Sequence, residues 1–136
     1  MRNQEKLQGC NNKLIGLMDI IDSECKQKDY EVIITSGKRS PEANAVAGGA
    51  PKSDHLDGNA VDFMFSDKPI IFAHVTRLWE LVEKGAGLWG YVTKMEIVRD
   101  IVNRGTPQAR WTNHCHLTVM PEPRTAPPIF FTGVYA

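Results

Sequence analysis

The sequence has few cysteines, no excess charge of either sign and no long hydrophobic run. An odd total of three cysteines does not make a disulfide framework, so a reduced, cytoplasmic interior is expected. Lysine plus arginine and aspartate plus glutamate each number 16, and this balance argues against a dedicated nucleic-acid binder. No apolar run approaches the roughly 20 residues that a membrane-spanning helix needs. We therefore expect neither a nucleic acid nor a membrane as a partner.

The length and composition are those of one small globular domain. With 136 residues, 42% of them hydrophobic and 24% charged, the chain can bury its own core as a single domain over residues 1–136. Residues 1–6 are followed by no apolar segment of the kind a secretory signal needs, so synthesis in the cytoplasm is expected. No exposed heptad repeat indicates an oligomer, and we expect a monomer.

The hydrophobic pattern predicts three helices. In the first, six apolar residues recur at helical spacing, namely Leu7, Cys10, Leu14, Leu17, Ile21 and Cys25. A short second helix covers residues 41–47 and begins after an N-cap at Ser40. The third helix follows Pro69 and ends at Gly85.

Strands are predicted between and after these helices, over residues 31–35, 59–65, 88–92, 95–98 and 111–119. The C-terminal segment is rich in proline and is expected to run over the surface as a tail. Because helices and strands alternate irregularly, the order favours an α+β fold, a single domain with a small antiparallel sheet flanked by helices.

Two short segments carry the residues with the most chemistry. The first is residues 53–62, with the sequence SDHLDGNAVD, and the second is His114-Cys115-His116. Because side chains alternate along a strand, His114 and His116 project together and Cys115 projects away. A histidine and an aspartate of the first segment could join one or both imidazoles in a three-ligand site of the catalytic zinc type. The charge of such an ion activates water and polarises a carbonyl oxygen, which suits amide hydrolysis.

Four motifs taken together resemble one family. They are SGKRS at residues 36–40, GGA at 48–50, S-x-H-x-x-G-x-A-x-D at 53–62 and H-x-H at 114–116. The combination is similar to the zinc D-Ala-D-Ala carboxypeptidase and L-alanyl-D-glutamate endopeptidase family, murein peptidases that share the fold of the hedgehog signalling domain. The resemblance extends over residues 35–119 and implies a hedgehog/D-Ala-D-Ala-peptidase-like α+β fold.

The resemblance implies a zinc site at three of these residues. His55, Asp62 and His116 would ligate Zn²⁺. The structural alternative is a loop histidine and a strand aspartate that only hydrogen-bond nearby backbone. His114 would be the acid/base histidine beside the metal, or a hydrogen-bond donor that orients its neighbour.

Three further residues would support this site. Arg39 would take part in catalysis and substrate binding by holding a carboxylate or a carbonyl oxygen, since its planar guanidinium suits either role. Ser53 would hydrogen-bond the substrate or position the loop that carries His55. Gly58 would allow a backbone turn in which a Cβ does not fit. The alternative for Arg39 is an ion pair with a nearby acid, namely Glu42, Asp54 or Asp57.

The sequence also departs from the family pattern. Some relatives have an acidic general base three residues before the last zinc histidine, where this chain has Asn113. His114 is then the candidate base, and Asp57 and Glu96 are minor candidates for which a surface position is preferred. Residues 94–110 form a longer and more charged stretch than compact relatives have.

We interpret the chain as a zinc-dependent peptidase that hydrolyses amide bonds in peptidoglycan stem peptides, as a D-Ala-D-Ala carboxypeptidase or an endolysin-type endopeptidase. Phage endolysins of this family are often small single domains without a signal peptide. Action of such a protein on the cell wall needs a lysis pore or delivery by a virion. The alternative is a non-catalytic metal-binding structural or cell-wall-binding module of the same fold, such as a phage virion component. A hydrolase of another small amide is a third interpretation.

Overall fold

A five-stranded sheet forms the centre of the structure. The computed structural model describes residues 1–46, 48, 52–85 and 87–131 of the chain. The strands are β1 (Val32–Ser36), β2 (Ala60–Phe65), β3 (Val92–Val102), β4 (Arg110–Val119) and β5 (Ile129–Phe131), in the order β1-β2-β4-β3-β5. Neighbouring strands are antiparallel except β5, which runs parallel to β3. The sheet is therefore mixed, and the expected antiparallel sheet is wrong at this edge because the proline-rich tail adds a short strand there.

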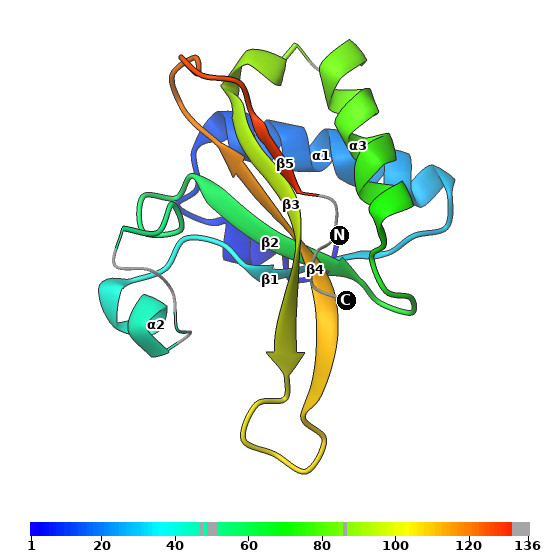
Figure 1. The fold of residues 1–136 in the computed structure, drawn as a ribbon, viewed down its shortest axis with the longest axis vertical. Coiled ribbons are helices and arrows are strands. Elements are labelled where there is room, and N and C mark those ends of the chain that lie inside the picture. Colours follow the sequence, from blue (N-terminus) through cyan, green and yellow to red (C-terminus); the bar gives the residue numbers. More distant parts are fainter. Residues whose placement is uncertain (47, 49–51, 86, 132–136) are drawn as a thin grey trace.

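Two long helices cover one face of this sheet (Figure 1). The helical segments are η1 (Gln4–Leu7), α1 (Asn12–Gln27), α2 (Pro41–Val46), α3 (Phe72–Gly85) and η2 (Trp89–Tyr91), where η denotes a 3-10 turn. α1 and α3 share a hydrophobic core with the strands, whereas α2 lies to one side of the sheet. The α+β class that the sequence predicts is confirmed. None of the described helices is long and apolar enough to cross a membrane.

The first predicted helix begins later than its apolar pattern suggests. Leu7 lies in η1, and α1 starts only at Asn12. The break occurs because Gly9 adopts a φ of +85° and Asn11 has extended backbone as the N-cap of α1. The six apolar residues at helical spacing are nevertheless all buried, so the predicted stripe is confirmed as part of the core.

The cap of the short helix is also confirmed. The Ser40 hydroxyl accepts a hydrogen bond from the Ala43 N–H at 3.1 Å, which satisfies one of the free donors at the start of α2. Ala47, predicted as the last residue of this helix, and residues 49–50 of the GGA motif lie outside the part of the chain that the structure describes.

The strand predictions hold from β1 to β4 in the order across the sheet and fail on the β3 side. β1, β2 and β4 each lie within one residue of a predicted strand. Residues 88–92, predicted as a strand, form η2 and only the start of β3. The strand predicted over residues 95–98 is the middle of the much longer β3, which pairs with β4 along most of its length.

Side-chain alternation divides the sheet into a core face and a second face. Phe63 of β2 and Cys115 of β4 are register partners and are fully buried in the core. The next pair along, Asp62 and His116, therefore projects from the opposite face. Glu96 of β3 is the partner of His116 on its other side, so three polar residues form one row across three strands.

All three cysteines are free and buried. Cys115 is fully enclosed on the core face, as expected for a small apolar residue that is not a metal ligand. Burial raises the pKa of the Cys25 thiol to about 11, which keeps it protonated and unreactive at neutral pH.

Asn11 ties the start of α1 to both central strands. Its backbone N–H donates to the carbonyl of Gly58 at 3.0 Å. Its side-chain Nδ2 donates to Asn59 Oδ1 at 2.9 Å and to the carbonyl of Val119 at 2.7 Å, while its Oδ1 accepts from the Leu14 N–H. One residue thus joins the turn before β2 to the end of β4.

Gly58 makes the close approach at this junction possible. It has a φ of +73°, and a Cβ placed on it would lie 2.4 Å from the carbonyl oxygen of Gly9. Both the left-handed backbone and the contact exclude other residues, because the opposing atom is backbone and cannot swing aside. The predicted need for glycine between His55 and Asp62 is confirmed.

We predict that Gly58→Ala lowers the free energy of unfolding by about 3 kcal/mol or more, of which the left-handed backbone accounts for about 1–2 kcal/mol. Gly105→Ala is the matched control, because Gly105 has a φ of +79° and a Cβ added to it would meet no described atom within 4 Å. Urea denaturation of both variants measures the difference. Equal losses would show that the contact with Gly9 is not important.

Candidate metal centre

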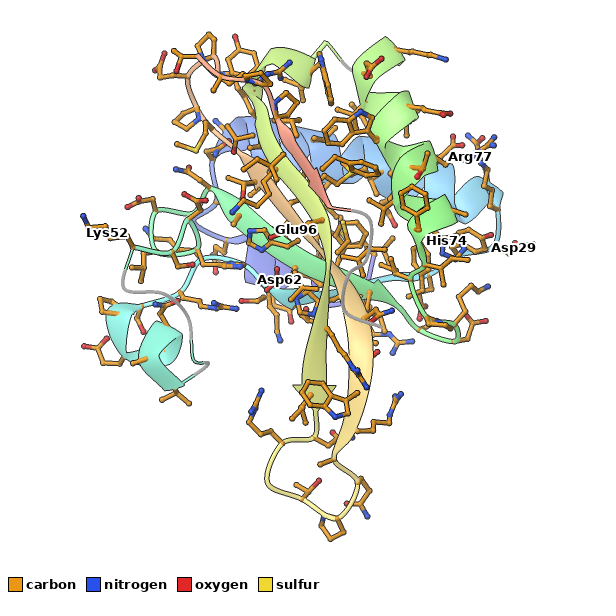
Figure 2. All side chains as sticks on the ribbon, in the orientation of Figure 1. Asp29, Lys52, Asp62, His74, Arg77 and Glu96 are labelled. Atoms are coloured by element: carbon orange, nitrogen blue, oxygen red, sulfur yellow. The ribbon has the colours of Figure 1, made fainter. Side chains whose placement is uncertain are left out.

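The carboxylate of Asp62 is the centre of the second face of the sheet (Figure 2). Its Oδ1 lies 2.7 Å from His116 Nδ1 and 3.7 Å from His114 Nε2. Its Oδ2 lies 3.2 Å from His55 Nε2 and 3.3 Å from Arg39 Nη2. Burial alone raises the pKa of the Asp62 carboxyl, but hydrogen bonds from His116 and His55 outweigh it and hold the pKa well below its usual range. Asp62 is therefore an anion enclosed by nitrogen atoms.

His55 is oriented by a backbone carbonyl. It belongs to the turn before β2, and its Nδ1 lies 2.8 Å from the carbonyl oxygen of Gly37. Because a carbonyl oxygen only accepts, Nδ1 carries the proton and donates it. Nε2 is then the ring nitrogen directed at Asp62, and it is the atom that would ligate a metal ion in place of its hydrogen bond to the carboxylate.

His116 is oriented in a similar way from the neighbouring strand. Its Nδ1 faces Asp62, and its Nε2 lies 3.1 Å from the hydroxyl oxygen of Thr118. Thr118 is 1% exposed and projects from the same face of β4, two residues further on. Sequence analysis missed Thr118, although strand alternation from His116 would have pointed to it.

These residues fit a zinc ion. One ligand atom from each of His55, Asp62 and His116 lies within 4.8 Å of the other two. Two imidazole nitrogens and one carboxylate are the donor set of catalytic zinc sites, and a carbonyl or hydroxyl behind each imidazole is the usual support. The structure thus brings together the three ligands that the sequence predicts; their role as ligands stays a prediction.

Arg39 lies beside this centre, and most of its N–H groups donate hydrogen bonds to other residues of the protein. Its Nε donates to Ser36 Oγ at 2.9 Å, Nη1 to Asn44 Oδ1 at 3.3 Å and Nη2 to Asp62. Three of its five N–H groups are therefore used, and its side chain is 17% exposed. The alternative of an ion pair is correct in kind but wrong in partner, because the acid is Asp62 and not one of the three nearby acids considered from the sequence.

Ser53 contacts the turn that carries His55. Its hydroxyl oxygen accepts a hydrogen bond from the His55 N–H at 3.3 Å. The contact matches the second of the two expected roles for Ser53, the positioning of this turn. The Arg39 N–H donates to the His55 carbonyl at 2.9 Å and holds the same turn from the other side.

The residues considered for acid/base chemistry divide between the two faces. His114 is buried and has its Nε2 directed at Asp62. Asn113 projects from the opposite face, because it is an odd number of residues away from both His114 and His116. Its Nδ2 donates to the carbonyl of Ile70 at 3.3 Å. Glu96 lies half-buried beside His116, which corrects the preferred surface position for this residue (Figure 2). Asp57 is exposed, as preferred.

A comparison with family models identifies the chain's relatives. A model described as peptidase M15 matches residues 1–98, which is more than half of the chain and includes His55 and Asp62. The chain belongs to the peptidase M15 family. This is the family of zinc D-Ala-D-Ala carboxypeptidases that the motifs resemble. The match ends within β3, so His114 and His116 lie beyond it and only the fold brings them to Asp62. Neither the curated proteins nor the solved structures contained a match.

We predict that Thr118→Val weakens zinc binding about 10- to 100-fold, because His116 loses the hydroxyl that fixes its ring. Competition with a chromogenic chelator measures the affinity. Thr112→Val is the matched control, since Thr112 lies on the same strand but is not one of the residues that hold the three ligands in place. Unchanged affinity in Thr118→Val would contradict the assigned orientation of His116.

Proposed function

We propose that this member of the peptidase M15 family is a zinc-dependent peptidase that hydrolyses amide bonds in peptidoglycan stem peptides, as a D-Ala-D-Ala carboxypeptidase or an endolysin-type endopeptidase. The convergence of His55, Asp62 and His116 on one point carries the proposal. The family match supports a peptidase, and the donor set supports zinc. Action on this substrate places the protein at the cell wall, and we infer a monomer in which one chain supplies the whole centre.

His55, Asp62 and His116 would hold the zinc ion, which would supply the positive charge that activates water and polarises a carbonyl oxygen. His114 is the proposed acid/base, because its Nε2 faces the centre without belonging to the ligand set. It takes a proton from the attacking water and returns that proton to the leaving amine. His114 is 7% exposed, and this burial limits the movement of its imidazole before the substrate arrives.

Arg39 and Ser53 are the proposed substrate contacts. Two N–H groups of Arg39 have no partner among the described residues, and we propose that they bind a substrate carboxylate or the carbonyl oxygen as it gains charge. The fixed part of the guanidinium keeps those two groups in a defined direction. Ser53, on the same turn as His55, would hydrogen-bond the peptide next to the scissile amide.

The alternative of a non-catalytic module depended on Asn113, which stands where some relatives have an acidic base. Its side chain faces away from the metal centre, so its identity has little bearing on catalysis. Glu96 instead supplies a carboxylate on the correct face, next to His116. It is the second candidate for proton transfer.

We expect zinc-loaded protein to release new amine from purified murein or from a peptide ending in D-Ala-D-Ala. His116→Ala should lose both bound zinc and this activity, because two ligands hold the ion far more weakly than three. Metal analysis and amine detection measure the two effects. A zinc-loaded protein that releases no amine from either substrate would favour the non-catalytic module, and full zinc content in the variant would remove His116 from the ligand set.

We predict that His114→Gln lowers kcat about 10²- to 10⁴-fold while zinc content stays at one ion per chain, because the variant loses proton transfer and keeps the ligands. Glu96→Gln is the matched comparison, since it removes a charge at a similar place. A larger loss of kcat in Glu96→Gln than in His114→Gln would transfer the acid/base role to Glu96.

A further inference from the structure

The short helix α2 buries a single residue, and that residue is polar. Of the six residues from Pro41 to Val46, all of which the structure describes, only Asn44 is buried, at 3% exposure. Val46 is 88% exposed, and the helix lies to one side of the sheet without joining the hydrophobic core (Figure 1). A helix that packs for stability buries its apolar residues and exposes its polar ones. A contact made by Asn44 therefore explains the position of α2 better than core packing does.

The buried contact of Asn44 is with Arg39. The side-chain Oδ1 of Asn44 accepts a hydrogen bond from Arg39 Nη1 at 3.3 Å. The backbone of Asn44 is itself fixed, because its N–H donates to the carbonyl of Ser40 at 2.9 Å in the first turn of the helix. A short side chain on a capped helical turn thus places one acceptor at a defined point beside the guanidinium.

A second neutral acceptor holds another nitrogen of the same guanidinium. Ser36 is the register partner of Asp62 on the neighbouring strand β1, and its hydroxyl oxygen accepts from Arg39 Nε at 2.9 Å. Nη2 is the nitrogen that contacts Asp62, at 3.3 Å from Oδ2. Each of the three guanidinium nitrogens therefore has a different acceptor.

This distribution differs from the usual pairing of a guanidinium with a carboxylate. Two parallel N–H groups commonly bind the two oxygens of one carboxylate. A pair of that kind would engage both oxygens of Asp62, which face His116 and His55. It would also set the guanidinium charge directly against the carboxylate. Ser36 and Asn44 are neutral, so they bind two nitrogens without cancelling the positive charge.

We propose that Asn44 is a positioning residue that acts through Arg39. By binding Nη1 it keeps the guanidinium from a two-point pair with Asp62. One consequence is that the carboxylate stays open to a metal ion. The other is that N–H groups of Arg39 stay available to a substrate anion, and this second consequence rests on the proposed function because it requires a peptide substrate.

The zinc affinity of matched variants tests the first consequence. Asn44→Leu removes the acceptor at nearly constant volume, and zinc binding should weaken about tenfold, as for other residues that support a metal ligand. Competition with a chromogenic chelator measures the affinity. Val46→Ala is the matched control, because it changes the same helix at an exposed position. Unchanged affinity in Asn44→Leu, or an equal loss in Val46→Ala, would overturn the proposal.

A double-variant cycle shows whether Asn44 acts through Arg39. In an Arg39→Gln background, Asn44→Leu should leave zinc affinity unchanged, because the guanidinium that Asn44 holds is gone. The same loss in both backgrounds would show a structural role only and overturn the proposal.

Ser36→Ala keeps the test decisive if Asn44→Leu does not fold. It releases Nε from the other side of the guanidinium and should also weaken zinc binding about tenfold. This loss should likewise vanish in the Arg39→Gln background. Unchanged zinc affinity in Ser36→Ala would contradict the idea that neutral acceptors hold Arg39 away from Asp62.

The kinetic constants of the zinc-loaded variants test the second consequence. For a peptide ending in D-Ala-D-Ala, kcat/KM of Asn44→Leu should fall about tenfold at equal zinc content, the size of one charge-assisted hydrogen bond. A rise in KM alone would assign the held N–H groups to the substrate carboxylate, and a fall in kcat would assign them to the carbonyl oxygen. An unchanged kcat/KM would remove the second consequence.

The two measurements also separate this proposal from the proposed function. Weaker zinc binding by Asn44→Leu, in a chain that releases no amine from murein or from the peptide, would keep the positioning role and remove the peptidase assignment. Release of amine by the unaltered chain, with equal zinc affinity in Asn44→Leu, would do the reverse.

Discussion

The burial of one carboxylate in the middle of a sheet is the constraint on which the rest of the site depends. A lone buried anion is strongly destabilising, so Asp62 requires cationic or hydrogen-bonding partners on every side. The fold supplies them from three separate segments, namely the turn before β2, strand β4 and the residues before α2. A metal ion would suit such a cluster because it would bring positive charge to the carboxylate and use the two imidazole nitrogens that face it as ligands. The same contacts to Asp62 therefore both stabilise the second face of the sheet and position the candidate ligands.

Strand alternation separates the apolar side chains of the core from the polar side chains of the metal centre. Each central strand is apolar on the side that meets α1 and α3, and its intervening residues carry the chemistry. The register between β2 and β4 sets Phe63 against Cys115 and Asp62 against His116, so the same ladder that builds the core aligns the ligands. A slip of one residue would place the histidines in the core and the cysteine in the site. The enclosed core therefore protects the geometry of the metal centre.

The sequence predicts the contents of the site better than its surroundings. The family resemblance of the motifs implies the set His55, Asp62 and His116, and strand alternation adds that His116 projects away from the side of Cys115. The neighbours Gly37 and Thr118 are not predicted, since a backbone carbonyl has no sequence signature and a threonine has many uses. The position of Glu96 is not predicted either, because its distance from His116 depends on the register of the β3–β4 hairpin, which the residue pattern does not reveal.

The fold is likewise predictable where the local residue pattern determines the structure, and it is not predictable where distant contacts do. The residue pattern indicates the two long helices, α1 and α3, and the strands β1, β2 and β4. The break at Gly9 and the short β5 depend on contacts made at a distance, where tertiary structure overrides local preference.

The hydrogen bonds of Asn11 make the geometry of the metal centre depend on the N-terminal segment, although that segment contributes none of the three candidate ligands. Through Asn59 and Val119 this side chain clamps the beginning of β2 to the end of β4, the two strands whose ligands must meet. Fraying of the first helix would therefore loosen the hold on the ion while the remaining core stayed intact. Heat, or a bulky fusion ahead of Met1, would on this basis deplete the bound metal before it melted the domain.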